Sequence, residues 1–126
     1  ELVFIPVNVI SNEEKLESLK EKCDTNLEKE ILDAIYKSGL RLPDDAQIVI
    51  CDGDNPVVKP DFLYESLGSK GLCVFVDGPD HEKESVQNED NTKRRWLRAN
   101  GYRYIIFDYK NSPDYKDEIQ GLKERI

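Results

Sequence analysis

Residues 59–81 read KPDFLYESLGSKGLCVFVDGPDH, and this stretch decides the fold. The run Leu72–Val76 is apolar without a break, which is typical of a central strand that is buried on both faces. Gly68–Gly71 predicts a turn before this run, and the segment 77–79 (DGP) ends it. The apolar residues inside Lys59–Glu65 predict a neighbouring strand. Together these features predict the centre of a β-sheet.

The segment Gln47–Cys51 predicts another strand ahead of these two. Residues 52–54 (DGD) have the composition of a turn, so we expect Lys59–Glu65 to be the second strand of a hairpin that begins with Gln47–Cys51. Residues 1–10 are rich in β-branched side chains. They predict a strand or an extended lead-in from an upstream domain, with Pro6 favouring a sheet edge.

Two helices are expected in the first third of the chain. Ser11 and Glu14 have the spacing of a capping box, as do Thr25 and Glu28. The first helix contains few apolar residues and is expected to be a surface helix or a connector. The second is expected to end at Gly39. It carries an apolar stripe of Leu27, Ile31, Leu32 and Ile35.

The last third of the chain predicts two helices around one strand. His81–Asn91 is polar and predicts a loop or a helix start, and Thr92–Asn100 predicts a helix that Gly101 ends. Tyr102–Tyr109 predicts a buried strand, and Asp114–Ile126 a terminal helix. The apolar side chains that we expect to face inward from the Thr92–Asn100 helix are Trp96 and Leu97.

This order of elements predicts an α/β fold. Three strands would form a meander, and a right-handed helical crossover would add a further strand to give a mixed sheet with helices on its faces. A chain of 126 residues is the size of one domain. We expect residues 1–23 to form a lead-in and connector helix, and residues 24–126 to form the domain.

Composition excludes several classes of protein. The net charge is −8, which argues against a general basic coat for nucleic acid. No apolar run approaches the ~20 residues of a transmembrane helix, so no membrane association is expected. The sequence contains no methionine, which is expected of a piece excised from a longer protein.

The cysteines predict reduced thiols. Cys23, Cys51 and Cys73 are odd in number and widely spaced, and with a single histidine they cannot form a zinc site at the usual spacing. A cytoplasmic location is therefore expected.

Acidic residues stand where the predicted strands and helices begin or end. Asp61 begins one strand, Asp77 ends the most apolar one, Asp90 precedes the basic helix, and Glu28 lies in the first turn of the striped helix. Mg²⁺ binds one or two carboxylates together with water and substrate phosphates. Strands in a sheet lie about 4.8 Å apart, so neighbours could share one ion that polarises a phosphodiester. For Glu28, the capping box alone is an alternative explanation.

Four segments of the chain match, in the same order, the sequence pattern of a known protein family. Their matching residues are Thr25, Glu28, Ile31 and Ile35; Pro60, Asp61 and Phe62; Phe75, Val76, Asp77, Gly78 and His81; and Asp90, Lys93, Leu97, Gly101 and Tyr102. This pattern resembles the PD-(D/E)XK superfamily of endonuclease-like domains, and most closely its very-short-patch-repair (Vsr-type) branch.

The resemblance implies a restriction-endonuclease-like three-layer fold with a central mixed β-sheet flanked by helices. It implies Mg²⁺-dependent hydrolysis of DNA phosphodiesters, with Mn²⁺ as a substitute, in DNA repair or processing. A helicase-like protein that carries this domain at its C-terminal end would supply upstream domains as partners.

Residue roles follow from the resemblance by position. Asp61 would be the central metal ligand, with the backbone carbonyl of Val76 and the carboxylate of Asp77 beside it. His81 would act as the acid or base, or would position the water or the leaving group.

Two further acids complete the implied catalytic set. Glu28 would hold a water molecule at the metal, and Asp90 would orient His81 or the basic helix.

Three departures from the family pattern leave alternatives open. Phe75 stands where the superfamily has an acid, its strand has no lysine, and Lys93 replaces an expected arginine. A module that has lost activity could instead dock DNA, or a protein partner through its acidic surface. A purely structural domain is the third possibility, and it predicts that Asp61 and Asp77 lie far apart and that neither is near His81.

A local basic segment bears on the substrate. Residues 93–103 contain five cations and no acid, which suits a phosphodiester next to a metal site, although a solvated helix face is the alternative. With so few cations, the domain alone is expected to bind DNA weakly and with steep salt dependence. The expected DNA contacts are Lys93, Arg94, Arg95 and Arg98.

Overall fold

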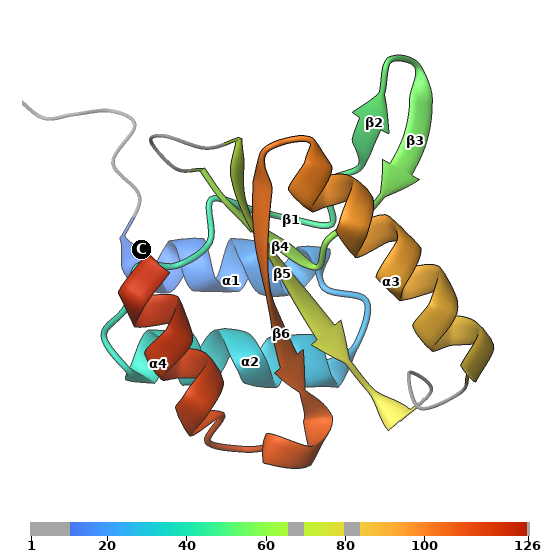
Figure 1. Cartoon of the computed structure of the whole chain (residues 1–126). Helices are drawn as coiled ribbons and strands as arrows, with labels where there is room; N and C mark the ends of the chain where they lie inside the picture. The colour runs from blue at the N-terminus through green and yellow to red at the C-terminus, as the bar shows by residue number, and fades with distance from the viewer. Residues whose placement is uncertain (1–10, 66–69, 80–83, 126) are drawn as a thin grey trace, which may run out of the picture.

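A mixed four-stranded sheet forms the centre of the protein (Figure 1). The computed structural model describes residues 11–65, 70–79 and 84–125. The strands of this sheet are β1 (Asp45–Ala46), β4 (Phe62–Tyr64), β5 (Gly71–Asp77) and β6 (Tyr102–Asp108). Their order is β1-β4-β5-β6, with β4 antiparallel to β1 and β5, and β6 parallel to β5. The predicted α/β class with a mixed sheet is confirmed.

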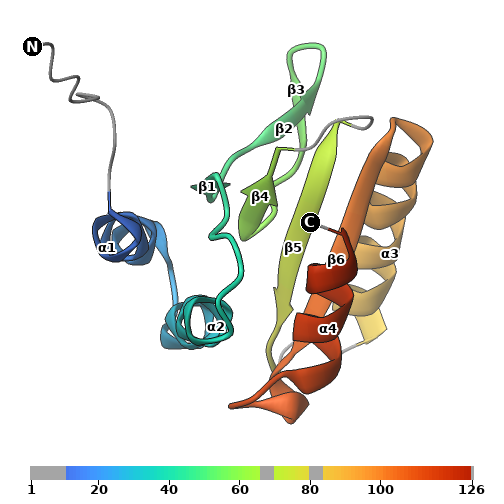
Figure 2. The ribbon, with the colours of Figure 1, turned by 90° about the vertical axis from the view of Figure 1, so that its left-hand side faces the viewer.

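Helices cover both faces of this sheet. They are α1 (Asn12–Lys22), α2 (Asn26–Lys37), α3 (Glu84–Ala99) and α4 (Lys116–Arg125). Figure 2 shows α1 and α2 on one side of the sheet, α3 on the other, and α4 beside β6. A short 3₁₀ turn, Tyr109–Asn111, follows β6.

Strand β5 is buried on both faces, as its apolar run predicts. A central strand with a helix layer on each side must be apolar at every position, because successive side chains point to opposite faces. Asp77, the last residue of β5, is the first that is not buried. The side chains of β5 belong to two hydrophobic clusters. Leu72, Val74 and Val76 lie in the main cluster, and Cys73 and Phe75 lie in the cluster beneath α3.

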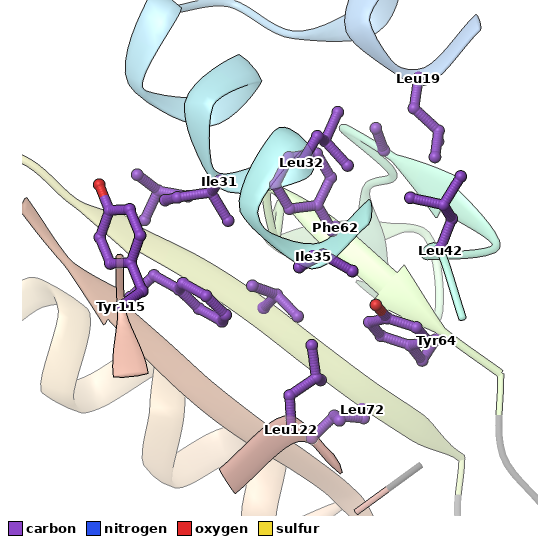
Figure 3. Close-up of a cluster of buried hydrophobic side chains, with 14 of the residues drawn as sticks. Leu19, Ile31, Leu32, Ile35, Leu42, Phe62, Tyr64, Leu72, Tyr115 and Leu122 are labelled. Carbon is purple, nitrogen blue, oxygen red and sulfur yellow. The ribbon is translucent and has the colours of Figure 1, made fainter. Parts of the chain in front are cut away.

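The main cluster is built on the apolar stripe of α2 (Figure 3). Ile31, Leu32 and Ile35 have no exposed surface, and they pack with Phe62 of β4 and Leu122 of α4. Burial of each such side chain contributes about 1.5–3 kcal/mol, so this stripe anchors α2 to the sheet.

Helix α1 belongs to the same core. Its capping box is confirmed, because the Ser11 hydroxyl accepts a hydrogen bond of 3.1 Å from the backbone N–H of Glu14. Leu16 and Leu19 are 7% and 3% exposed and lie in the main cluster. The helix therefore contributes to the core of the domain even though most of its surface is polar.

The predicted hairpin forms between different segments. A two-residue turn joins β2 (Ile50–Asp52) to β3 (Asn55–Val58), and these two strands form a separate sheet that projects beyond the main one (Figure 1). The expected pairing of Gln47–Cys51 with Lys59–Glu65 is wrong, because so tight a turn pairs only the residues next to it. Gln47 has φ +57°, and of the predicted strand Gln47–Cys51 only Ile50 and Cys51 are in β2, while β1 lies before it.

Helix α3 begins at Glu84, earlier than the predicted start at Thr92. Acidic side chains favour the first turns of a helix, so the polar segment before Thr92 extends it. As a result, Asp90 lies inside the helix and does not precede it. Gly101, with φ +88°, ends the helix as predicted, because glycine adopts this conformation without strain.

Strand β6 is the last strand of the sheet order, not a fully buried strand. Only Phe107 among its residues is buried, since one long side of the strand has no partner strand within the described ranges. The prediction of a strand here is confirmed, and its predicted full burial is wrong.

Some predictions fall outside the part of the chain that the structure describes. They are the lead-in at residues 1–10, the first half of the turn at 68–71, and the role of His81. None of the helices in the described ranges is long and apolar enough to cross a bilayer. Cys23, Cys51 and Cys73 are free thiols.

We expect Leu19→Ala to lower the free energy of unfolding by about 2–5 kcal/mol, because it removes a buried side chain from the main cluster. Val49→Ala is the control: Val49 is 51% exposed, and its loss should change stability by less than about 0.5 kcal/mol. Urea denaturation followed by circular dichroism measures both. Equal stability of the two variants would mean that α1 is a detachable connector.

Candidate metal and phosphate site

A pocket of about 290 Å³ opens where β5 ends and α3 passes over it. Three carboxylate side chains and three cationic side chains line the pocket, together with apolar residues. The lining residues are Val58, Lys59, Asp61, Phe75, Val76, Asp77, Asp90, Lys93 and Arg94.

Asp61 is fixed at the start of β4 by its own backbone and side chain. Its backbone N–H donates to the carbonyl of Val74 at 3.0 Å, and its carbonyl accepts from the N–H of Gln47 at 3.1 Å. Its carboxylate oxygen Oδ2 accepts from the N–H of Val76 at 2.7 Å. The carboxylate is therefore bound directly to the end of β5.

The bond to Val76 also orients the backbone carbonyl of that residue. In a strand, the N–H and C=O of one residue point to the same side. Since the N–H of Val76 points at Asp61, its carbonyl lies on that side too. The resemblance predicts this carbonyl as a metal ligand, and that role stays a prediction.

Arg94 reaches into the pocket from α3. Its guanidinium Nη2 lies 2.8 Å from Oδ1 of Asp77 and 3.9 Å from Oδ2 of Asp90, one helical turn before it. The residue is 8% exposed, and Cζ lies 5.0 Å from the centroid of the Phe75 ring. Arg94 thus joins the end of β5 to α3 by charge and by a cation–π contact.

A second pocket, of about 440 Å³, adjoins the first and contains Glu28. The two share Asp61 and Val76. Glu28 is 4% exposed; its carboxylate accepts from the Thr25 hydroxyl at 2.7 Å, and its backbone N–H donates to that hydroxyl at 3.3 Å. The predicted capping pair is confirmed. Gln47 Nε2 also donates to the Glu28 carboxylate.

Most of the predicted site residues meet in these two pockets. Asp61 and Asp77 line the same pocket, contrary to the expectation from a purely structural domain that they lie far apart. His81 lies outside the described residues. The predicted residues in the first pocket are Asp61, Val76, Asp77, Asp90, Lys93 and Arg94, and Glu28 lines the second.

The four predicted DNA contacts do not form one surface. Arg94 is buried, whereas Arg95 is exposed and its Nε donates to the carbonyl of Asn91 at 3.4 Å. Arg98 is exposed and stacks on Tyr104, with Cζ 5.0 Å from the ring centroid. Lys93 lines the pocket, and its Nζ lies 3.3 Å from the carboxylate of Glu89.

Sequence reasoning missed Lys59 and Gln47. Lys59 lines the first pocket, and its place two residues before Asp61 is the signal that could have found it. Gln47 donates hydrogen bonds to Glu28 and to Asp61. The sequence predicts a regular strand at this residue, and no feature of the sequence indicates its positive φ angle.

The donor atoms suit a hard cation. Carboxylate and carbonyl oxygens are the ligands that Mg²⁺ prefers, and it needs only one or two carboxylates, since water and substrate fill the other positions. Within the described ranges, no cluster of three or more His, Cys, Asp or Glu side chains could hold a metal by itself.

No protein-family model matches this chain, and neither a curated protein nor a solved structure matches it. The geometry of the pocket is consequently the basis for proposing a function.

The pKa of the Cys23 thiol depends on the negative charge at this site. Burial, and then the negative charge of Glu28, raise the pKa of its thiol to about 11; Asp61 adds a smaller effect in the same direction. By contrast, burial alone raises the pKa of Cys73, to about 12.

We expect Glu28→Gln to lower the pKa of the Cys23 thiol and so to speed its alkylation. The thiolate is the reactive form, and at pH 9 a thiol with this pKa of about 11 is only about 1% thiolate. Removing a nearby negative charge stabilises the thiolate, while glutamine keeps the capping pattern.

The measurement is the rate of iodoacetamide modification of Cys23 between pH 8 and 9.5, in a Cys51→Ser background, mapped by mass spectrometry. Glu21→Gln is the control, because Glu21 is close in sequence but is not among the charges that act on this thiol. An unchanged rate in Glu28→Gln would contradict the placement of Glu28 beside Cys23.

Proposed function

We propose that this domain is a metal-dependent endodeoxyribonuclease with a restriction-endonuclease-like fold. One observation carries the proposal: Asp61, which directly precedes β4, and Asp77, which ends the adjacent antiparallel strand β5, line one pocket with the cations of α3. Metal-dependent phosphodiester hydrolysis uses this combination, with carboxylates for a divalent ion and cationic side chains for the phosphate.

Asp61, Asp77 and the carbonyl of Val76 would hold Mg²⁺, or Mn²⁺ in its place. The ion would polarise the phosphodiester and lower the pKa of a water molecule. Asp61 is held by the Val76 amide, so the donors are preorganised by the sheet itself.

Other residues of the two pockets would orient the substrate. Lys59 and Lys93 line the first pocket and are partly exposed, so their ammonium groups can reach a phosphate oxygen. Asp90 orients Arg94 from the same helix. Glu28, in the second pocket, would hold a water molecule, and His81 would transfer the proton.

The substrate would be DNA, bound weakly by this domain alone. The accessible cations of α3 are few, and the chain as a whole carries a charge of −8. Tight binding would come from upstream domains, as in a helicase-like DNA-repair protein.

A second function, a docking module without catalysis, is favoured by a specific contact. Asp77 already has Arg94 as its partner at 2.8 Å, which explains this acid without a metal. Phe75 occupies the position of the family's usual acid, and the acidic surface would suit a basic protein partner. Metal binding separates the two functions.

We expect Asp61→Asn to abolish metal-dependent cleavage of plasmid and single-stranded DNA in Mg²⁺ and in Mn²⁺. The cleavage rate should fall by at least about 100-fold. That is the largest typical effect of mutating a residue that only orients a metal ligand, so loss of a ligand itself should cost at least as much. Asparagine retains an oxygen that can accept from the Val76 N–H, so the fold is kept while the charge is lost.

Asp52→Asn is the matched control, since Asp52 is an exposed acid on the β2–β3 hairpin. Cleavage that persists in Asp61→Asn at the wild-type rate would refute the nuclease. Folded protein that neither cleaves DNA nor binds Mn²⁺ would support the docking module.

We also expect Arg95→Gln to weaken DNA binding and to make the slope of log K against log salt less steep by about 0.9 on duplex DNA and about 0.7 on a single strand. The reason is that an exposed cation on α3 releases one counterion for each phosphate it contacts. Fluorescence anisotropy at several salt concentrations gives the slope. Lys116→Gln, on α4, is the control, and an equal change in both variants would contradict a DNA surface on α3.

A further inference from the structure

Cations lie over aromatic rings at three places on the side of the sheet that α3 covers. The pairs are Arg94 over Phe75, Arg98 over Tyr104 and Lys70 over Tyr102, with the charged groups 5.0, 5.0 and 5.9 Å from the ring centroids. The Phe75 and Tyr104 rings also meet edge to face, with their centroids 6.1 Å apart. Cation–π pairs occur about once per 70–80 residues, so three on one face exceed the number expected for the whole chain.

These pairs form a row, the cation–π row, from the start of β6 to the pocket. Tyr102 and Tyr104 are two residues apart on β6, so they point to the same face of the sheet. Phe75 is in register with Ile106, the next residue of β6 on that face. Successive pairs are therefore about 6.6 Å apart along the strand. The row ends at Phe75, which lines the pocket.

The two pairs farther from the pocket are accessible to a ligand. Arg98 and Lys70 are exposed, and the tyrosine rings beneath them are partly exposed. Within the described ranges, the ion pairs of α3 are made by Lys93 and Arg94. The outer face of the Arg98 guanidinium therefore remains open, with its inner face on Tyr104.

The chemistry of these two pairs suits unpaired bases. A base can stack on the outer face of a guanidinium plane that already lies on a ring. The Lys70 ammonium lies farther from its ring, so a base can take the face of Tyr102 while the ammonium meets the adjacent phosphate. The exposed Arg95 of α3 offers a further charge to the backbone of the same strand.

The spacing of the pairs favours a single strand over a duplex. In a duplex, the nucleotides of one strand are about 3.4 Å apart along the axis, and each base is covered by its neighbours. Bases in that arrangement cannot occupy successive pairs about 6.6 Å apart. An extended single strand can place one base on each pair, because its bases are not held in a stack.

We propose that the Arg98–Tyr104 and Lys70–Tyr102 pairs bind successive bases of single-stranded DNA and guide that strand toward the pocket. This inference rests on the nuclease proposed above and deepens it, because it names the form of the substrate. It concerns binding alone, so it can be tested without a metal ion and without cleavage.

The test is fluorescence anisotropy of the full chain at low salt, with divalent metal removed. The probes are oligothymidylate, an abasic oligomer of the same length and a duplex of the same length. The abasic oligomer has the same phosphates but no bases, so it separates stacking from charge. We expect oligothymidylate to bind at least about fivefold more tightly than the abasic oligomer, which corresponds to the low end of the effect of one stacked base. It should also bind more tightly than the duplex.

The variant Arg98→Lys keeps the charge and removes the planar group. We expect its affinity for oligothymidylate to fall about fivefold, while its affinity for the abasic oligomer stays the same. Tyr102→Leu tests the other pair and should show the same selective loss. Arg95→Lys is the matched control and should change neither affinity, because Arg95 is an exposed arginine of α3 that stacks on no ring in the described ranges.

The outcomes separate this inference from the nuclease. Equal binding of oligothymidylate and the abasic oligomer, tighter binding of the duplex, or an equal loss for both oligomers in Arg98→Lys would overturn the inference. The nuclease would still stand if metal-dependent cleavage is lost in Asp61→Asn. Base-dependent binding by a protein that never cleaves DNA would refute the nuclease and support the cation–π row as the DNA surface of a docking module.

Discussion

The burial of β5 on both faces is the constraint on which the rest of the protein depends. Helices on either side leave no position between Gly71 and Val76 where a charged side chain could be solvated. Charge can enter only where the strand emerges, at Asp77. The antiparallel strand β4 begins at the same end, next to Asp61. One packing requirement therefore gathers the acids at one edge and leaves the rest of the sheet apolar.

Arg94 and Phe75 are best understood as a pair. A buried guanidinium is tolerated when carboxylates and an aromatic face surround it, and losing one partner of a buried ion pair costs about 3–5 kcal/mol. Here Asp77 supplies the close carboxylate, and the Phe75 ring lies 5.0 Å from Cζ. A carboxylate at position 75 would add a third acid around one cation. The uncharged ring of Phe75 therefore suits a site where Asp77 already neutralises the charge of Arg94.

Local signals in the sequence predicted local structure well. The capping residues Ser11 and Thr25 act within one helical turn, so their spacing was sufficient. The inward position of Arg94 could also have been predicted, because Arg94 lies three residues before Leu97, on the same helix face. The positive φ of Gln47 could not be predicted, because it accompanies tertiary contacts of this residue to Asp61 and Glu28.

Asp61 has a structural task and, in the proposed function, a chemical one, and the two depend on the same bond. Its Oδ2 accepts the Val76 N–H, which ties the start of β4 to the end of β5 whether or not an ion is bound. The same bond directs the Val76 carbonyl toward the carboxylate, because a strand residue presents its N–H and C=O to one side. The donor geometry is therefore part of the sheet, so an ion would meet ligands that need little rearrangement.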